Sequence, residues 1–485
     1  MYLGIDLGTS GVKAAVLAGD GRTMATASAP LSASHPRSGW SEQDPEHWWA
    51  GTDAAVLAID PALRSAVRGI GLSGQMHGAT LLDDADRVLR PCILWNDGRS
   101  AAQCRALKQA EPAVEEITGN LVMPGFTAPK LLWVRDNEPE IFARIATVLL
   151  PKDYLRLRMT GAKVSDMSDS AGTLWLDMAK RDWSDAMLAA CGMDRRQMPR
   201  LHEGPEITAT LRPEVASAWG MERVPVVAGG GDNAAGAVGA GVVNPGDAFL
   251  SLGTSGVTFV ATESYRPNSE GAVHTFCHAL PGRWHQMAVH LSAASCIDWA
   301  MRQLGAPDAA AFHALAQSVE PFGGPEIFLP FLSGERTPHN DPDIRAGWLR
   351  CDSSTQPARL ASAVLEGVAF AFADGIEALR NAGSPVEEAM MIGGGARSRH
   401  WGTILASSTR TRLLYGNEAE AGPAVGAARL ALAGVSRASV ESICPKPDTV
   451  FVAEPDEALA NRLAPNLSYY RRAYGALSSI EDTEQ

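Results

Sequence analysis

The chain has 485 residues, a length that suggests about three domains or two large ones. Hydrophobic residues make up 46% and charged residues 20%, close to the average of globular proteins, which excludes disordered and fibrous classes. The net charge of −13 argues against nucleic acid or an anionic membrane as the main partner, although it does not exclude a small phosphorylated ligand.

The sequence lacks the usual signals of export and of disulfide or zinc chemistry. No apolar run is long enough to span a bilayer, and residues 1–6 lack the basic start of a signal peptide. The seven cysteines are scattered without a CxxC pair, which is typical of reduced thiols. We therefore expect a cytoplasmic protein that binds neither membranes nor nucleic acids.

Segments typical of helices and of strands alternate along the chain, which indicates an α/β fold with largely buried sheets. Four apolar, β-prone runs end abruptly in glycine-rich turns, namely residues 2–5, 224–228, 248–252 and 389–392. Because open α/β sheets bind ligands at the carboxyl ends of their strands, these four turns are the candidate binding sites.

The first of these turns follows the strand at residues 2–5. Glycine and small hydroxyl residues let backbone N–H groups approach a polyphosphate closely. The candidate phosphate contacts are Gly8, Thr9, Ser10 and Gly11. Asp6 would repel a triphosphate without an intervening divalent cation, so we interpret it as a Mg²⁺ partner, direct or through water. Capping of the turn is its alternative role.

Further along the chain, two polar turns suit a sugar. Gly74 and Gly78 bracket a sharp turn that presents an amide, a soft apolar contact and an imidazole, supplied by Gln75, Met76 and His77. The second turn, residues 95–99, offers the face of Trp95, although Asp97 and Arg99 fit a structural ion pair equally well. A third polar loop, residues 333–340, is compatible with ligand contact or with loop hydrogen bonding.

The glycine turn at residues 229–234 (GGGDNA) matches the dinucleotide fingerprint only in form. A pyrophosphate there would meet the carboxylate of Asp232, and Asp247 precedes the next strand, whereas the fingerprint wants an acidic residue at its end. Asp232 is better interpreted as a general base that accepts a hydroxyl proton during in-line phosphoryl transfer.

One sequence repeat indicates two related domains. The segment LGTSG at residues 7–11 recurs at residues 252–256, about half a chain later, and each copy predicts a β-hairpin with a tight turn. Two such turns favour a phosphate clamp between domains 1–244 and 245–485. The alternative interpretation is two unrelated hairpin turns. The second turn adds Gly253, Thr254 and Ser255 to the candidate phosphate contacts.

Seven motifs together resemble the FGGY carbohydrate kinases. In chain order they are GIDLGTSGVK, GQMHG, ILWNDGR, VAGGGDNAAGAVG, LSLGTSG, SGERTPHN and IGGGARS, and they extend from Gly4 to Ser398. The combination of GQMHG with WNDGR is similar to the branch of this family that phosphorylates D-xylulose. The resemblance implies two actin-like (ribonuclease-H-like) domains around a cleft that holds ATP and the sugar.

The resemblance also implies roles for individual residues. Asp232 would be the catalytic base and Asp6 the second essential carboxylate, near Mg²⁺. Met76, His77 and Asn233 would lie at the sugar, beside Asp232; Gln75 and Trp95 are expected there from the two polar turns themselves. The residues expected against the adenosine of ATP are Gly394, Gly395, Ala396 and Ser398; some relatives have an asparagine after these glycines, where this chain has Arg397 and Ser398.

The implied reaction is transfer of the γ-phosphoryl group of ATP to the 5-hydroxyl of D-xylulose. One alternative is a kinase for another pentulose or polyol, although the glycerol branch has an Arg-Glu pair where Met76 and His77 stand. An alternative of another class is an actin-like ATP-binding scaffold or chaperone, which needs the phosphate turns but no sugar site. A homodimer stays open.

Overall fold

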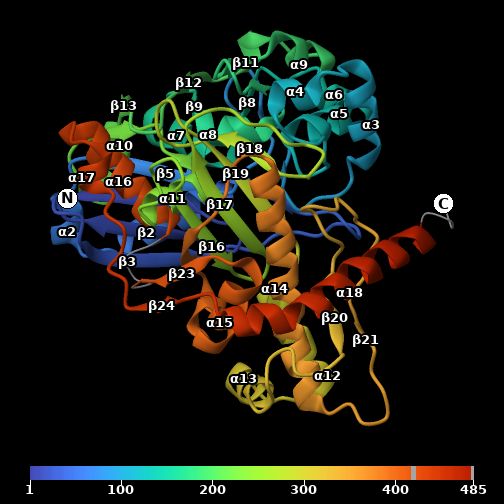
Figure 1. The fold of residues 1–485 in the computed structure, drawn as a ribbon. Coiled ribbons are helices and arrows are strands. Elements are labelled where there is room, and N and C mark those ends of the chain that lie inside the picture. The colour runs from blue at the N-terminus through green and yellow to red at the C-terminus, as the bar shows by residue number, and fades with distance from the viewer. Residues whose placement is uncertain (417–421, 482–485) are drawn as a thin grey trace.

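The computed structural model describes residues 1–416 and 422–481. Two seven-stranded mixed sheets, one in each half of the chain, form its framework, and helices cover their faces (Figure 1). The α/β class predicted from the alternation of segments is confirmed.

The N-terminal sheet has the strand order β13-β14-β5-β1-β2-β3, and β15 pairs with the end of β5. Its strands are β1 (Tyr2–Leu7), β2 (Gly11–Leu17), β3 (Thr23–Pro30), β5 (Ile70–Gly74), β13 (Ile207–Thr210), β14 (Pro225–Val227) and β15 (Gly230–Gly231). An antiparallel meander of β1, β2 and β3 continues into the parallel strands β5 and β14, with β13 antiparallel at the edge.

The C-terminal sheet repeats this plan in the order β18-β19-β17-β16-β22-β23-β24. Its strands are β16 (Ala248–Leu252), β17 (Gly256–Thr262), β18 (His274–Cys277), β19 (Trp284–His290), β22 (Glu388–Ile392), β23 (Arg412–Tyr415) and β24 (Phe451–Ala453). Here β16, β17 and β19 form the meander, β22 and β23 are the parallel strands and β24 is the antiparallel edge. The sequence repeat therefore corresponds to a repeated sheet.

Both predicted hairpins are confirmed, because each LGTSG segment joins the first two strands of its sheet. The N–H of Gly8 donates to the carbonyl of Gly11 at 2.9 Å, and the N–H of Gly253 donates to the carbonyl of Ser255 at 3.1 Å. In each half, the residue before the LGTSG segment pairs with a residue of the neighbouring parallel strand. Asp6 of β1 lies opposite Ser73 of β5, and Ser251 of β16 lies opposite Ile392 of β22.

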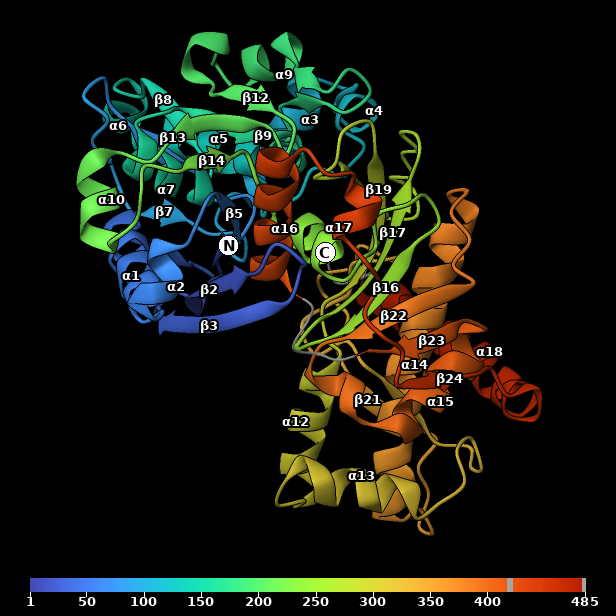
Figure 2. The same ribbon diagram turned by 90° about the vertical axis from the view of Figure 1, so that its left-hand side faces the viewer.

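Helix α16 (Pro423–Ser436) crosses over from the C-terminal half and packs on the N-terminal sheet, beside α11 (Asp232–Gly239) (Figure 2). Small residues allow this close approach. A Cβ atom on Gly4 would lie 1.9 Å from the carbonyl oxygen of Ala424, and one on Gly426 would lie 1.7 Å from that of Ala235. The two helices thus connect the halves of the molecule through backbone-to-backbone contact.

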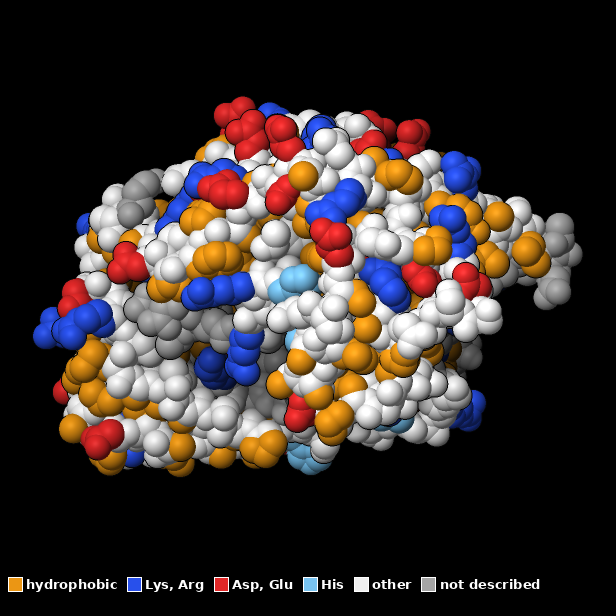
Figure 3. All heavy atoms as spheres, turned by 60° about the horizontal axis from the view of Figure 1, so that its bottom comes forward, with side chains coloured by type: hydrophobic (Ala, Val, Ile, Leu, Met, Phe, Trp, Pro, Cys, Tyr) orange, Lys and Arg blue, Asp and Glu red, His pale blue; other side chains and the backbone are white. Residues whose placement is uncertain are grey.

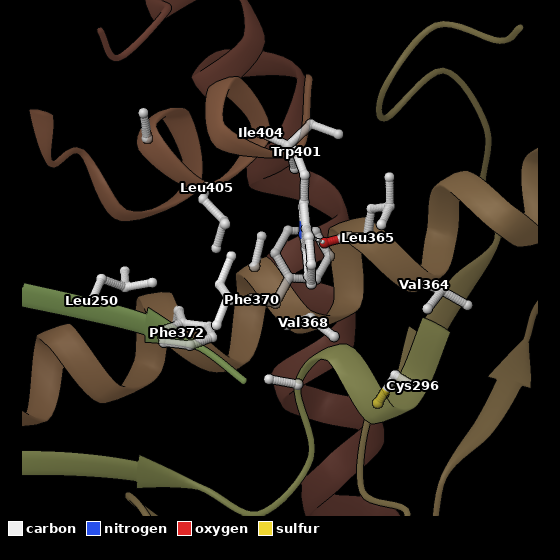
Figure 4. Close-up of a cluster of buried hydrophobic side chains, with 14 of the residues drawn as sticks. Leu250, Cys296, Val364, Leu365, Val368, Phe370, Phe372, Trp401, Ile404 and Leu405 are labelled. Carbon is white, nitrogen blue, oxygen red and sulfur yellow. Dashed lines mark hydrogen bonds between the residues drawn. The ribbon is translucent and has the colours of Figure 1, made fainter. Parts of the chain in front are cut away.

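The C-terminal core surrounds the long helix α14 (Pro357–Asn381), against which α15 (Arg399–Thr409) packs (Figure 4). The indole of Trp401 is fully buried, and its Nε1–H donates to the carbonyl of Leu365 at 3.1 Å. This cluster of apolar side chains includes Leu250, Cys296, Val364, Val368, Phe370, Phe372, Ile404 and Leu405.

The remaining elements surround the two sheets. The helices are α1 (Pro45–Leu57), α2 (Pro61–Ser65), α3 (Ala101–Ala110), α4 (Val114–Thr118), α5 (Thr127–Asn137), α6 (Pro139–Phe142), α7 (Pro151–Thr160), α8 (Met167–Ser170), α9 (Asp185–Ala190), α10 (Pro213–Trp219), α12 (Ala294–Leu304), α13 (Ala309–Gln317), α17 (Val440–Ile443) and α18 (Glu457–Glu481). Single 3₁₀ turns are η1 (Ala171–Thr173), η2 (Arg195–Gln197) and η3 (Gly394–Arg397). Short strand pairs are β4 (Glu42–Gln43) with β7 (Cys92–Ile93), β6 (Thr80–Leu82) with β8 (Thr147–Leu149), β9 (Val164–Asp166) with β12 (Arg200–His202), β10 (Leu176–Asp177) with β11 (Asp182–Trp183), and β20 (Ile327–Leu329) with β21 (Gly347–Leu349).

Charged side chains are mixed on the face of the molecule that Figure 3 shows, where acidic and basic groups alternate without a block of one sign. Among the helices of residues 1–416 and 422–481, none is long and apolar enough to cross a membrane.

Candidate functional site

Three strand ends bring the two predicted carboxylates to one edge of the N-terminal sheet. Asp6 near the end of β1 pairs with Ser73 of β5, and Ser73 pairs on its other side with Gly230 of β15. Asp232 follows two residues after Gly230 as the first residue of α11. The segment that carries Asp232 is therefore placed by the same strand that flanks Asp6.

The carboxyl group of Asp6 lies in a crowded environment. Its Oδ1 atom is buried without a hydrogen-bond partner. Burial raises its pKa to about 6, against the opposing effects of the Ser73 hydroxyl and the positive charge of Lys13. A carboxylate oxygen with no donor is one that a cation would stabilise.

The pKa of the Asp232 carboxyl group is raised further than that of Asp6. Burial and then the negative charge of Asp6 raise its pKa to about 7, and the hydrogen bonds from Asn233 oppose this shift. The backbone N–H of Asn233 and its Nδ2 both donate to Asp232 Oδ1, at 2.7 and 3.0 Å. A carboxylate that titrates near neutrality is well matched to accepting a proton from a hydroxyl group.

The acidic groups fit a Mg²⁺ ion that arrives with a phosphate ligand better than a resident metal centre. Within the described parts of the chain, no group of three or more His, Cys, Asp and Glu side chains comes together to hold a metal ion. Mg²⁺ is commonly held by one or two carboxylates together with substrate phosphates. The orphaned Oδ1 of Asp6, near the charge of Asp232, meets that requirement.

The side-chain amide of Gln75 forms hydrogen bonds with two other side chains. Its side chain is buried; its Oε1 accepts from the hydroxyl of Thr9 at 3.0 Å, and its Nε2 donates to Oε1 of Gln43 at 2.9 Å. The Thr9 hydroxyl also accepts from Nε1 of Trp95 at 3.0 Å. The first hairpin turn and the two predicted sugar turns are therefore joined through one threonine hydroxyl.

The neighbouring turn residues lie against the segment that carries Asp232. Met76 is buried, and a Cβ atom on Gly231 would lie 3.0 Å from its Sδ. His77 adopts a left-handed backbone conformation with φ 71°. Its Nδ1 lies 2.6 Å from the carbonyl oxygen of Gly172, and burial lowers its pKa to about 3. Because a carbonyl oxygen only accepts, Nδ1 carries the proton, and the neutral ring keeps Nε2 as an acceptor.

The second polar turn divides into an exposed tryptophan and a buried ion pair. Trp95 is 42% exposed. The guanidinium of Arg99, in contrast, contacts Asp97 at 2.7 Å and Glu42 at 2.6 Å and stacks over the ring of Trp40. Of the two interpretations offered for Asp97 and Arg99, the structure supports the structural pair.

Residues of both halves of the chain that the sequence did not single out also lie near His77. The rings of Phe126 and Phe276 contact it, with centroids 4.8 and 6.3 Å away. The positive charge of Arg336 lowers the pKa of both His77 and His274, although burial is the main cause in each case. Among the described residues, no hydrogen-bond or ion-pair partner holds this guanidinium, which leaves it available as a donor. Only the polar composition of the loop 333–340 signalled it in the sequence.

The two phosphate turns differ in exposure. Ser10, Thr254 and Ser255 are exposed, whereas Gly8, Thr9 and Gly253 are partly buried. The carbonyl of Thr254 accepts from the N–H of Ala293 at 2.9 Å and from the hydroxyl of Ser295 at 2.8 Å, which ties the second turn to the start of α12.

Of the residues predicted to contact adenosine, Gly394 lines a cavity of about 330 Å³ at the carboxyl end of β22. Its lining is largely apolar, and it includes Ser251, Met390, Ile392, Gly393, Gly394, Arg397 and Pro423. Gly393 has φ 90°, and Gly395 packs against Leu252 and Trp401. Ser398 caps α15 by accepting from the N–H of Trp401 at 3.3 Å. The side chain of Ala396 lies outside the described residues.

Two sheets of one plan, with binding turns at equivalent strand ends, define a two-domain α/β protein of the actin-like type. Models of the FGGY family of carbohydrate kinases match the chain, the N-terminal domain model over residues 1–239 and the C-terminal one over residues 248–435.

Named relatives match over nearly the whole length. The xylulose kinase of Escherichia coli K12 is 53% identical over 98% of this chain and 99% of its own. That of Bacillus subtilis is 40% identical over 89% and 88%. The solved structure of a xyloylose kinase from Brucella ovis superimposes with a TM-score of 0.96 at 49% identity, covering 99% of both chains. The chain belongs to the FGGY family of carbohydrate kinases, which confirms the predicted family and fold class.

Proposed function

We propose that this protein transfers the γ-phosphoryl group of ATP to the 5-hydroxyl of D-xylulose, giving D-xylulose 5-phosphate and ADP. The observation that carries the chemistry is the carboxyl group of Asp232, which lies near the second carboxylate, Asp6, and has a pKa of about 7. The sugar is proposed from the xylulose kinases that are 53% and 40% identical to this chain.

Asp232 acts as the general base. It accepts the proton of the 5-hydroxyl as the oxygen bonds to the γ-phosphorus, while the bond between the β–γ bridging oxygen and that phosphorus breaks and ADP departs. Two hydrogen bonds from Asn233 to Oδ1 fix the orientation of this carboxylate and leave Oδ2 for the hydroxyl.

Mg²⁺ would be held by Asp6, with Asp232 close by, and by the phosphates of ATP. When bound, the ion neutralises charge on the triphosphate. The backbone N–H groups of the turns at Gly8–Gly11 and Gly253–Gly256 would contact the phosphates, and the cavity at Gly393 and Gly394 would take the adenosine.

The sugar would lie against Met76 and the imidazole of His77, with Asn233 next to the base. The unprotonated Nε2 of His77 accepts from a sugar hydroxyl, and Arg336 donates to a sugar oxygen. Gln75 positions Thr9 and Trp95, so its contribution to sugar binding is indirect.

An actin-like scaffold or chaperone that only binds ATP needs neither a general base such as Asp232 nor a neutral histidine such as His77. The kinase is the better proposal for that reason. We also infer that the division into domains lies at residues 244 and 245, that the enzyme works in the cytoplasm, and that a homodimer is compatible with this fold.

The base is tested by Asp232→Asn. Because the amide cannot accept the hydroxyl proton, kcat should fall by about two orders of magnitude or more while ATP binding, measured by calorimetry, stays near wild type. Near-native turnover with normal ATP binding would show that another group accepts the proton.

A further inference from the structure

A buried ion cluster lies beneath the two turns that carry the base and the sugar contacts. Lys152 of α7 contacts Asp153 at 2.6 Å, Asp166 at 2.8 Å and Asp169 at 3.2 Å, and all four side chains are fully buried. Burying so many charges costs free energy unless they are paired and hydrogen-bonded. None of these groups has a part in the proposed reaction, so the cluster calls for another role.

Ser168 connects this cluster to the turn before the base. Its hydroxyl donates to Asp166 Oδ2 at 2.5 Å and accepts from the backbone N–H of Gly231 at 3.0 Å. Asp166 also accepts from the N–H of Ser168 at 2.7 Å, which fixes the serine at the start of α8. The backbone N–H of Gly231 therefore donates to a hydroxyl that is itself held by the carboxylate of Asp166.

The same buried segment holds the histidine of the sugar turn. Four residues after Ser168, the carbonyl oxygen of Gly172 accepts from Nδ1 of His77 at 2.6 Å. A Cβ atom on Gly172 would lie 2.6 Å from that nitrogen, so the backbone and the ring are in direct contact. One segment thus sets the position of both the base-bearing turn and the sugar-binding imidazole.

Helix α7 supports the strand ends from the other side. Arg156 Nη1 donates to the carbonyl of Val227 at 2.6 Å, and its Nη2 donates to that of Ala228, both just before the glycine turn. A Cβ atom on Gly74 would lie 3.2 Å from Cβ of Lys152, so the helix also lies directly under the sugar turn.

We propose that Ser168 is a positioning residue for phosphoryl transfer, which fixes the Gly231 amide and thereby the direction of the Asp232 carboxylate. The Lys152 cluster anchors the serine, and this inference rests on the proposed role of Asp232. In-line transfer depends steeply on geometry, and a displacement of about 1 Å can cost roughly a hundredfold in rate.

The test compares Ser168→Ala with Ser165→Ala. Ser165 is a matched control because it is equally buried in the same segment and its hydroxyl accepts from that of Ser170 at 2.9 Å, away from the glycine turn. We expect S168A to lower kcat for D-xylulose about ten- to a hundredfold with a much smaller change in KM. S165A should keep kcat within about twofold of wild type, and it should lose less thermal stability than S168A, whose hydroxyl is hydrogen-bonded to a carboxylate.

A second measurement does not depend on turnover. Hydrogen–deuterium exchange of the peptide that contains residues 229–233 should be faster in S168A than in wild type and unchanged in S165A, because only the first variant removes the acceptor of the Gly231 amide. If S168A does not fold, Ser168→Cys, which keeps the size but weakens the acceptor, should give an intermediate loss of kcat.

Equal kcat in S168A and S165A, or unchanged exchange at residues 229–233 in S168A, overturns the positioning role. Failure of the proposed function has a different signature: the wild-type enzyme would not phosphorylate D-xylulose, while the exchange difference between the two variants would persist.

Discussion

Burial and the negative charge of Asp6 together raise the pKa of Asp232 at the carboxyl ends of the strands of the N-terminal sheet. Strand register explains their proximity, because Asp6 and Gly230 both pair with Ser73 of β5. Two carboxylates in this arrangement repel each other without a cation, so the site favours either one proton or one Mg²⁺. A divalent cation bound here would relieve this repulsion, in line with the proposed binding of MgATP.

The first prediction concerns the acidic limb of the pH profile. A base with a pKa of about 7 is protonated below that value, so kcat/KM for D-xylulose should fall about tenfold per pH unit below pH 6. The measurement is a coupled assay of ADP release from pH 5 to pH 9 with saturating Mg²⁺. An acidic limb at pH 4, the ordinary range of an aspartate, would contradict the shifted base.

The second prediction is a stability gain on removal of the base. The pKa of Asp232 is raised on folding, so the folded state loses stability as pH rises from about 4 to about 7, when the buried group must ionise. Asp232→Asn cannot ionise and should unfold at a higher temperature than wild type at pH 8, with the difference fading towards pH 4. Thermal melts at both pH values measure this, and a variant less stable than wild type at pH 8 would argue against it.

The third prediction concerns His77. Because burial lowers its pKa to about 3, the ring stays neutral across the physiological range. Titration of this histidine should therefore cause no inflection near pH 6.5 in the KM for D-xylulose. His77→Ala removes the acceptor and should raise that KM about tenfold, while the KM for ATP changes little. A comparable rise in both constants would place His77 outside the sugar site.

The fourth prediction concerns the Thr9 hydroxyl, which bridges Gln75 and Trp95. Thr9→Val removes both hydrogen bonds and leaves the Oε1 atom of Gln75 without its donor, at a cost of about 1–3 kcal/mol. Because this residue joins the phosphate turn to the sugar turns, KM should rise for ATP and for D-xylulose. Ser10→Ala, at the exposed next position, should change the sugar KM little. Equal effects of both variants on the sugar KM would argue against the bridge.

The fifth prediction concerns the contact between α11 and α16. Gly426→Ala places a methyl group where the carbonyl oxygen of Ala235 stands, and overpacking of this kind costs about 1–3 kcal/mol. Gly475→Ala is the matched control: it lies inside α18 with no atom within 4 Å of its added Cβ, so it should stabilise the protein by about 0.5–1 kcal/mol. Chemical denaturation of both variants tests the difference, and a neutral G426A would contradict the close helix contact.

Local patterns in the sequence predict the strand ends, both hairpins and the repeated domain plan, because apolar runs and glycine turns are readable within ten residues. The packing of α16 on the distant N-terminal sheet is not readable in this way, since it depends on the close approach of Gly4 to Ala424 and of Gly426 to Ala235 across the fold. The same holds for the contacts of Gln75, whose amide accepts from Thr9 and donates to Gln43. The Lys152 cluster likewise becomes visible only when α7 and α8 meet in space.

The central claim is tested most directly by a substrate panel. ADP release with MgATP is measured with D-xylulose, D-ribulose, L-xylulose, glycerol and 5-deoxy-D-xylulose, and the phosphorylated products are identified by phosphorus NMR. We predict the highest kcat/KM for D-xylulose, a 5-phosphate product and no sugar phosphate from the 5-deoxy compound. A clear preference for another acceptor, or ATP turnover that no pentulose changes, would contradict the proposed reaction.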